Sequence, residues 1–435
     1  MKRILSVLLC VLLGLAFAAP VLAMEDNSYI ITNPYEDVAW AEWDAYKANL
    51  HTHTTFSDGE DDLKSMAEEY YAQGYDVIAN TDHGVVSKPW DKAASSVFPM
   101  NLQNIFNSHD VLSSARMREM NEGEGRGGRG MLQVPLGIEM NAATVYKNHV
   151  VGLYAGWGQG WIGYSADYRT CIAGTQRRGG ISWIAHPGDY IKSESNPAAA
   201  KDPANVNFYA DILRDYESCL GIEIYNGSDG PTRQDRVLWD QLLMRLTPEG
   251  RQVWAFAVDD SHNVGDIGRT AQMLFMPENT TENVRTCLES GAFLACSRRD
   301  RVRLADFTGP SDQPFPGVTS IDITGDMITL TVTDAYRVEW IADGEIICYK
   351  DVSGTGVSSI ELGDYEDVIT CYVRAQVLGE GGITATQAFG VDKGDNYSHP
   401  DDSLQGWDRI KWYANLYLTR NVFGFLVETV MGLFN

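Results

Sequence analysis

Apolar and amphipathic stretches alternate along the chain from about residue 46 to residue 300. Seven short apolar stretches, bounded by turn residues, predict strands: 47–53, 75–81, 131–140, 149–154, 180–186, 219–225 and 253–259. Amphipathic stretches at helical spacing separate several of them: 61–74, 168–178, 232–246 and 281–291. Apolar strands interleaved with helices predict an α/β fold with a parallel sheet covered on both faces, either open or closed into a barrel.

The pattern changes after a stretch rich in proline and glycine at residues 308–317, which we interpret as a linker. Residues 318–395 show period-two alternation between turn residues and predict a small antiparallel β-sandwich of the immunoglobulin type. Residues 396–435 form a polar linker and then an apolar helix. Packing on the barrel is the favoured role of this helix, and contact with a membrane interface or a partner is the alternative. Arg420 and Glu428 argue against a full span.

The N-terminus has the pattern of a secretory signal peptide over residues 1–23. Lys2 and Arg3 precede an apolar run that ends in Val21-Leu22-Ala23. An uncleaved membrane anchor is the alternative, but the apolar run is short for a span. The sequence therefore predicts an exported protein that is secreted, periplasmic or held at the cell surface, with a first domain over residues 24–307.

Charge and cysteine content narrow the possible partners. Without the signal peptide, 32 basic residues stand against 59 acidic ones, and so acidic a surface makes long nucleic acid an unfavourable partner. Six cysteines remain and none forms a CxxC pair, so no zinc knuckle or redox motif is indicated. Cys348 and Cys371 could pair across neighbouring strands, and buried free thiols are the equally favoured alternative.

Six of the eight histidines stand in short motifs at the ends of predicted strands. The motifs are HTHTTFSDG, TDHG, NHVVGLY, IAHPG and VDDSH, and they supply His51, His53, His83, His149, His186 and His262. Three acids stand at matching positions: Asp58, Glu139 and Asp260. An HxH pair on a strand points both imidazoles to one face, and a closed barrel brings many strand ends to one centre. Nine nitrogen and oxygen ligands suit two or three ions that share bridging carboxylates.

These motifs, together with GIEMN, resemble those of the polymerase and histidinol phosphatase (PHP) superfamily over roughly residues 46–300. The layout, with a β domain after the metal-binding domain, resembles its carbaryl-hydrolase-like branch. The resemblance implies a distorted (β/α)7 barrel with a di- or trinuclear centre of Mn, Zn or Fe ions. It assigns the first metal to His51, His53, Glu139 and Asp260, lets Glu139 bridge to a second metal on His149 and His186, and assigns a third to Asp58, His83 and His262.

The implied reaction is attack by a metal-bridging hydroxide on an ester. Asp260, His83 and His262 are the expected catalytic side chains, the two histidines assisting departure of the leaving group. Other polar residues beside the motifs are candidates to orient ligands or bind substrate: Asp82, Asp259, Glu223, Asn226, Arg233 and Arg269. For each of them, an ordinary structural or surface role is the alternative.

Three functions remain open from the sequence. The first is a secreted phosphoesterase that acts on small phosphate esters, nucleotides or short oligonucleotides. The second keeps the metal centre but hydrolyses carboxylic or carbamic esters or amides. The third is a non-catalytic surface binding protein with a metal-stabilised barrel. The intact set of nine ligands favours an enzyme over the third.

Overall fold

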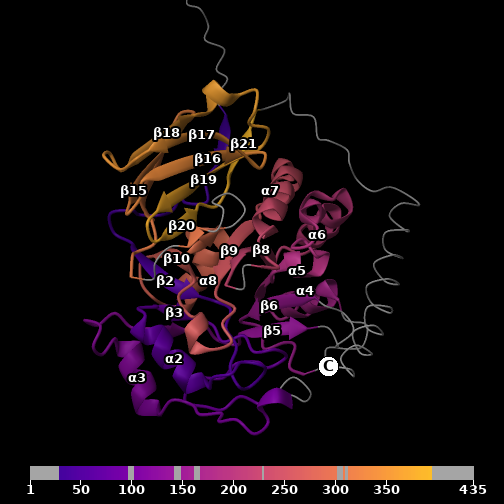
Figure 1. Cartoon of the computed structure of the whole chain (residues 1–435), viewed down its shortest axis with the longest axis vertical. Coiled ribbons are helices and arrows are strands. Elements are labelled where there is room, and N and C mark those ends of the chain that lie inside the picture. The colour runs from indigo at the N-terminus through magenta and orange to yellow at the C-terminus, as the bar shows by residue number, and fades with distance from the viewer. Residues whose placement is uncertain are drawn as a thin grey trace, which may run out of the picture.

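A computed structural model of the chain describes residues 29–96, 102–141, 148–160, 167–227, 230–300, 307–308 and 312–393. A β-rich C-terminal part lies at the top of Figure 1, helices α4 to α7 lie on the right, and α2 and α3 lie at the lower left. The predicted signal peptide and C-terminal helix fall outside the described residues. Within the described residues, no helix is both long enough and apolar enough to cross a membrane.

One sheet has five strands in the order β5-β6-β7-β8-β9. They are β5 (Ile138–Asn141), β6 (His149–Leu153), β7 (Ile181–Ile184), β8 (Cys219–Asn226) and β9 (Trp254–Val258). Strands β7, β8 and β9 are parallel, whereas β6 is antiparallel to both of its neighbours. The expectation of a parallel sheet is therefore wrong for β6, because the segment that joins β5 to β6 is too short for the crossover that parallel neighbours need.

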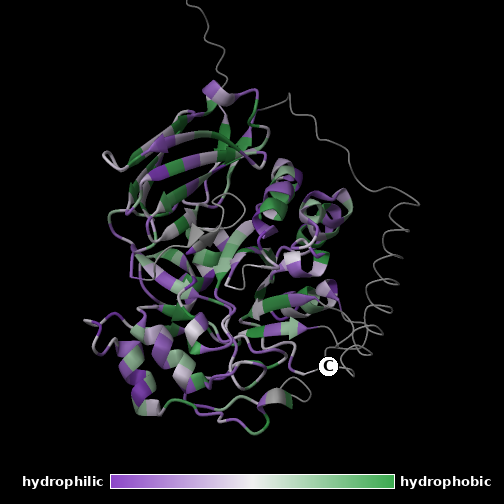
Figure 2. Ribbon diagram, viewed as in Figure 1, coloured by the Kyte–Doolittle hydropathy of each residue, from purple (hydrophilic) through white to green (hydrophobic). Residues whose placement is uncertain are grey.

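Helices cover this sheet, and each buries an apolar face against it. They are α4 (Tyr168–Gln176), α5 (Pro187–Ile191), α6 (Pro203–Asp215) and α7 (Asp235–Leu246). Aspartates cap the amino ends of α4 and α6, since Asp167 accepts from Thr170 N and Asp202 from Ala204 N. The 3-10 helices η2 (Pro197–Lys201) and η3 (Thr247–Glu249) adjoin them. Figure 2 shows hydrophobic residues concentrated along these strands.

The second sheet is mixed and has the strand order β1-β21-β19-β20-β11-β10-β2-β3-β4. It runs through both halves of the molecule, the first half being residues 29–300 and the β-rich second half residues 312–393. Its first-half strands are β1 (Ile30–Thr32), β2 (Asp44–Asn49), β3 (Val77–Ile78), β4 (Leu132–Gln133), β10 (Thr270–Met276) and β11 (Phe293–Ser297). Strands β2, β3 and β4 are parallel, and β10 is antiparallel to both β2 and β11. Three helices flank these strands: α2 (Leu63–Ala72), α3 (Ser114–Glu122) and α8 (Thr281–Ser290).

The two sheets meet at two isolated bridges. Thr52, just after β2, bridges to Ser261 just after β9, and His83, after β3, bridges to Glu139 in β5. Five ladders and these two bridges thus connect seven strands in a ring: β2, β3, β5, β6, β7, β8 and β9. Trp183 stacks on Phe256 between the sheets, with ring centroids 4.4 Å apart. The ladders alone do not close a barrel in the described residues, and the bridges lie at the edge that carries the histidine motifs.

The C-terminal part has two packed layers (Figure 1). One is the sheet β14 (Gly317–Thr324), β15 (Met327–Thr333) and β18 (Val357–Glu361). The other contains β16 (Arg337–Ala342), β17 (Glu345–Asp351), β19 (Tyr372–Gly379), β20 (Gly382–Ala385) and β21 (Phe389–Asp392). This second layer continues through the ladder of β20 with β11 into the first half. The described end of the predicted linker is packed too, because Phe315 is buried and lies under the Arg298 guanidinium.

A buried ion pair also joins the two halves. Arg374 of β19 donates two hydrogen bonds to Asp240 of α7, at 2.7 and 2.8 Å, and Tyr372 donates a third at 2.9 Å. Arg374 is fully buried and its guanidinium lies 4.9 Å from the Trp239 ring. The pKa of Arg374 is raised, because the attraction of Asp240 outweighs the burial that opposes its charge.

Cys348 and Cys371 are free thiols, as are the four other cysteines among the described residues. They do not lie on neighbouring strands, because β16 pairs with β17 on one side and with β19 on the other. The remaining short elements are η1 (Leu102–Asn104), η4 (Val264–Asp266), η5 (Leu362–Tyr365), β12 (Arg299–Asp300) and β13 (Phe307–Thr308).

Candidate metal centre

All nine residues proposed as ligands come together at one edge of the two sheets. His51 and His53 follow β2, His83 follows β3, and His186 follows β7. Glu139 stands within β5, while Asp260 and His262 follow β9. His149 begins β6 rather than ending it, and it reaches the same edge because β6 runs antiparallel to its neighbours.

The most buried part contains four ligand atoms, and each of its two carboxylate oxygens stands 3.1–3.3 Å from both of its imidazole nitrogens. His51 Nε2 and His53 Nε2 lie 3.1 Å apart. Glu139 Oε2 is 3.3 Å from each of these nitrogens, and Asp260 Oδ1 is 3.3 Å from His51 Nε2 and 3.1 Å from His53 Nε2. Neighbouring ligands about 2.1 Å from one metal, at octahedral or tetrahedral angles, stand about 3.0–3.4 Å apart. The spacing therefore fits one shared cation.

Two of these four atoms, Glu139 Oε2 and Asp260 Oδ1, are buried carboxylate oxygens that the hydrogen-bond geometry leaves without a partner, although His83 Nδ1 lies 2.8 Å from Glu139 Oε2. Buried carboxylate charge is costly unless positive charge lies beside it, from a cation or from protonated imidazoles. His51 Nδ1 lies 2.7 Å from Glu223 Oε1 and is therefore the protonated nitrogen of that ring. Its Nε2 consequently carries the lone pair that faces the other three atoms. The donor set fits a divalent cation.

Glu139 extends the cluster to a second group. Its other oxygen, Oε1, lies 2.8 Å from His149 Nδ1 and 3.2 Å from His186 Nε2. His83 Nδ1 also approaches Glu139, at 2.8 Å from Oε2. Because its two oxygens face different histidines, Glu139 is placed to bridge two ions.

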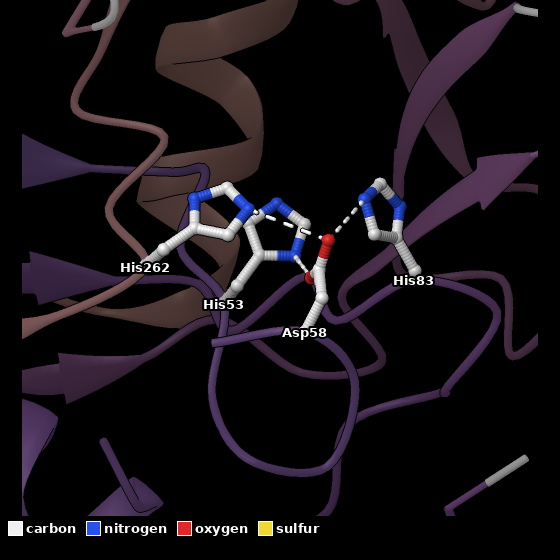
Figure 3. Close-up of side chains that lie close together, drawn as sticks. All are labelled: His53, Asp58, His83 and His262. Carbon is white, nitrogen blue, oxygen red and sulfur yellow. Dashed lines mark ion pairs between the residues drawn. The ribbon is translucent and has the colours of Figure 1, made fainter. Parts of the chain in front are cut away.

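Asp58 lies at the centre of a third group, shown in Figure 3. Its carboxylate oxygens lie 3.4 Å from His53 Nδ1, 3.4 Å from His83 Nε2 and 3.6 Å from His262 Nε2. His262 Nδ1 lies 2.9 Å from the Asp260 carbonyl oxygen, so this nitrogen is the donor and Nε2 is free to bind a cation. This group is the most open, because the side chains of Asp58 and His262 are 30 % and 35 % exposed while that of Glu139 is fully buried.

The groupings differ in part from those that the resemblance implies. His83 lies beside both Asp58 and Glu139, and His186 groups with His51 and Asp260 as well as lying near Glu139. His53 also joins Asp58, His83 and His262. Several side chains therefore belong to more than one group of ligand atoms. The structure does not assign each ligand to a single ion, as the sequence-based assignment does.

The pKa values of the clustered histidines and carboxylates are shifted, because groups of opposite charge are buried together. Burial opposes the imidazolium of His51, but Asp260, Glu223 and Glu139 outweigh it and raise its pKa well above the usual value. Burial also opposes the carboxylate of Glu139, yet His149, His83 and His51 hold its pKa well below the usual range. The pKa of His149 falls to about 4, mainly because it is buried. The carboxylates thus stay ionised and offer negative charge to a cation.

Two of the ligands have unusual backbone conformations. His186 has φ 27° and Asp260 has φ 47°, in the left-handed region that residues other than glycine seldom adopt. Strained backbone of this kind persists where the surrounding contacts enforce it, and it is concentrated at functional sites. Here Glu223 Oε2 accepts from His186 N, and Asn226 donates to Asp260 Oδ2 at 3.0 Å.

Glu223 and Asn226, the two polar residues singled out at the end of β8, both contact the cluster. Glu223 is fully buried and accepts from Trp183 Nε1 in addition to facing His51. Asn226 donates to Glu223 as well as to Asp260. Glu223 and Asn226 therefore hydrogen-bond to the ligands without themselves facing the shared cation position, and such contacts fix the orientation of ligands in metal sites.

Asp82 and Asp259 do not bond to a ligand imidazole, contrary to expectation. Asp82 accepts from Thr54 and from Ser57, whose hydroxyl lies 3.4 Å from His53 Nδ1. Asp259 accepts from Gly268 N and Thr270 N and so fixes the start of β10. Each aspartate anchors a loop that carries a ligand.

The two candidate arginines lie differently. Arg269 pairs with Asp266 at 2.6 Å, and Asp266 in turn accepts from His262 N. Arg233 follows β8, and its Nε is buried without a hydrogen-bond partner among the described residues. Arg269 is thus already paired, and Arg233 is the better placed of the two to meet an anion.

Two residues outside the sequence-based set, Asn141 and Tyr190, also contact the ligands. Asn141 lies beside His83 Nδ1 at 3.0 Å and His149 Nε2 at 3.4 Å. The Tyr190 ring packs 5.4 Å from that of His149 and 5.7 Å from that of His186. Asn141 stands two residues after Glu139 on one strand, so period-two alternation alone could have found it.

Comparison with known proteins agrees with this geometry. Residues 49–195 match the PHP domain. The matched segment contains seven of the nine proposed ligands: His51, His53, Asp58, His83, Glu139, His149 and His186. No curated protein matches the chain closely enough to count as a relative.

Solved structures similar to this chain have low sequence identity to it. A two-domain protein from Bacteroides vulgatus ATCC 8482, which contains a predicted PHP-like metal-dependent phosphoesterase, is 16 % identical with a TM-score of 0.43, over 85 % of this chain and 95 % of that one. Histidinol phosphate phosphatase from Lactococcus lactis subsp. lactis Il1403, complexed with zinc, L-histidinol and phosphate, is 15 % identical with a TM-score of 0.24, over 56 % and 94 %. An amidohydrolase from Chromobacterium violaceum is 14 % identical with a TM-score of 0.28, over 50 % and 88 %.

Proposed function

We propose that this protein is a metal-dependent phosphoesterase with a centre of two or three divalent cations. One observation carries the proposal: four buried ligand atoms from His51, His53, Glu139 and Asp260 stand at the spacing of a shared coordination shell. The second oxygen of Glu139 faces His149 and His186, which supports a further ion beside the first. The match to the PHP domain supports the same reading.

Cations bound here would supply Lewis acidity and would lower the pKa of a water molecule at the site. The chain itself supplies the geometry. Glu223 fixes the tautomer of His51, and the carbonyl of Asp260 fixes that of His262. Asp260 contributes Oδ1 to the buried group while Asn226 holds its Oδ2, so the carboxylate keeps one orientation through the reaction.

His83 and His262 are the side chains best placed to assist the leaving group. Both face Asp58 at the open end of the cluster, and His262 is 35 % exposed there. The pKa of His262 is raised to about 9, because hydrogen bonding to Asp58 and the charge of Asp260 outweigh its burial. With no cation on its Nε2, a histidine in this position can hold a proton near the leaving oxygen; with a cation there, it would act on the leaving oxygen through that cation instead.

The proposal extends to the fold around the centre, the identity of the metal and the substrate. The ring of seven strands joined by two bridges would be the distorted (β/α)7 barrel. Mixed imidazole and carboxylate ligands accept manganese, zinc or iron, and availability decides among them. The substrate would be a small phosphate ester, and the N-terminal pattern supports export.

The test is a substrate panel with manganese-loaded protein. Bis-p-nitrophenyl phosphate, p-nitrophenyl phosphate and p-nitrophenyl acetate carry the same chromophore on different acyl or phosphoryl groups. Phosphate ester turnover that His51→Ala abolishes is the expected result. Turnover of the acetate alone would replace the proposal with a carboxyl ester hydrolase, and no turnover by fully loaded protein would favour a binding protein.

A further inference from the structure

Two apolar side chains stand exposed at the corners of a turn beside the metal centre. Asn107 N donates to the Asn104 carbonyl, which closes a four-residue turn with Ile105 and Phe106 at its corners. Phe106 is 97 % exposed and Ile105 is 51 % exposed. Turn corners usually carry glycine, proline or short polar residues, so two large apolar residues here need a physical reason.

The turn is fixed to the loop that carries Asp58. Asn104 Nδ2 donates to the Ser57 carbonyl at 3.0 Å and to the Gly59 carbonyl at 2.6 Å, one residue on each side of Asp58. The side chain of Asn107 donates to that of Asn104 at 2.7 Å and holds the turn in shape. The position of Ile105 and Phe106 is therefore set relative to a ligand of the centre.

This side is also where the centre opens. Asp58 and His262 are the most exposed ligands, whereas His51, His53 and Glu139 are fully buried. Val264, two residues after His262, is another exposed apolar side chain, and its backbone N donates to Asp61 of the Asp58 loop. Exposed apolar side chains thus stand on the turn that is bonded to the Asp58 loop and on the segment that supplies His262.

The same side has acidic surroundings. Glu60 is exposed and Asp61 is half-buried on the Asp58 loop. Arg269 is already paired with Asp266. A second negatively charged group on the substrate would therefore be repelled here, whereas an uncharged apolar group would be accepted.

We infer that the site takes phosphate esters with an apolar group, which rests on Ile105, Phe106 and Val264 while the phosphoryl group lies on the metal centre. This inference rests on the proposed phosphoesterase function and specifies its substrate class. Binding is more favourable when a ligand covers exposed apolar side chains. Each fully buried methylene group raises the affinity by up to about fourfold.

The test is a series of alkyl p-nitrophenyl phosphate diesters, from methyl to hexyl, with manganese-loaded protein. The leaving group is constant, so differences in kcat/KM report contact with the alkyl chain. In the wild type we expect kcat/KM to rise about twofold per methylene group, because a rim buries each group only in part. The double variant I105S/F106S should lose this dependence and keep turnover of the methyl ester, which also shows that it is folded.

The matched control is I30S/Y349S, which removes two apolar side chains exposed elsewhere, and it should keep the wild-type dependence. A wild type indifferent to chain length, or an I105S/F106S variant that keeps the dependence, would overturn the inference. If the I105S/F106S variant keeps the dependence and also converts a dimer into a monomer in sedimentation, the inference is overturned and the turn instead joins two copies of the chain. Failure to hydrolyse any member of the series and p-nitrophenyl phosphate as well would instead refute the proposed function.

Discussion

The Nε2 atoms of His51 and His53 face each other at 3.1 Å in a fully buried position, between the carboxylates of Glu139 and Asp260. Glu223 occupies the Nδ1 side of His51, so its Nε2 must accept a cation or an added proton. The raised pKa of His51 expresses the same demand for positive charge, because Asp260 and Glu223 outweigh the effect of burial. The nearest neighbours of this pair thus define a cation site.

Replacing His51 by alanine should therefore remove at least one metal ion and lower phosphate ester turnover by at least about 10³-fold, as loss of a charge-stabilising group does in other enzymes. Metal content and turnover measured on the same preparation check this. His109→Ala is the matched control, because His109 stacks on Phe56 and bonds to Thr55 outside the cluster. Full metal content in His51→Ala would contradict the assignment.

Glu223→Gln should weaken metal binding without unfolding the protein. The amide keeps the shape of the side chain but no longer offers His51 Nδ1 a charged acceptor at 2.7 Å. Loss of such an outer carboxylate typically weakens metal affinity by about 10- to 100-fold. Competition with a chelator measures it, with the exposed Glu345→Gln as control. An unchanged affinity would mean that Glu223 only fills space.

The buried pair of Arg374 and Asp240 should make the two halves unfold together. Arg374→Met leaves Asp240 buried without its guanidinium and should cost about 3–5 kcal/mol of unfolding free energy. Arg285→Met, which breaks a surface pair with Glu289, should cost less than about 1 kcal/mol. Urea unfolding followed by fluorescence and circular dichroism checks both. A separate transition for the β-rich half would contradict the continuous sheet that joins β11 to β20.

Lys47 gives a pH dependence that does not involve the metal ligands. Burial lowers its pKa to about 8 from 10.5, although Asp259 acts in the other direction. The folded state therefore holds this proton more weakly than the unfolded state, which destabilises the protein below pH 8 and ceases to do so as the pH rises towards 10.5.

Lys47→Met should accordingly raise the unfolding free energy by about 1 kcal/mol at pH 7, after loss of the contacts with the Tyr75 ring and the Gln73 carbonyl is set against the gain. The difference from wild type should shrink between pH 8 and pH 10.5. Urea titrations at constant metal concentration measure it, with the exposed Lys64→Met as control. A gain that grows with pH would contradict the assigned burial effect.

Local patterns predicted most of the strands that surround the site, but they missed β10 and β11 and did not predict how the strands pair. The stretch 131–140, predicted as one strand, forms two strands, β4 and β5, in different sheets. Helix α2, expected within residues 61–74, buries one face at helical spacing: Leu63, Met66, Ala67, Tyr70 and Tyr71. The reversal of β6 was missed because residues on either side of a short connection carry no signal of direction, and this reversal brings His149 to the site from a strand start.

Contacts between distant segments were also beyond the sequence. Glu223 lies 172 positions from His51 along the chain, and only the fold shows that it faces that imidazole rather than Asp82 or Asp259. The same holds for the sheet shared by both halves, because backbone ladders leave no side-chain signature at β11 and β20. Asn141 is different, since alternation with Glu139 could have identified it.

The most direct test of the account is a count of the metal ions bound to purified, manganese-loaded protein. Inductively coupled plasma mass spectrometry on the wild type and on Glu139→Gln measures it. Because Glu139 offers one oxygen to the His51–His53 pair and the other to His149 and His186, we predict two or three ions per chain in the wild type and at least one fewer in the variant. One ion or none in the wild type would contradict the multinuclear centre.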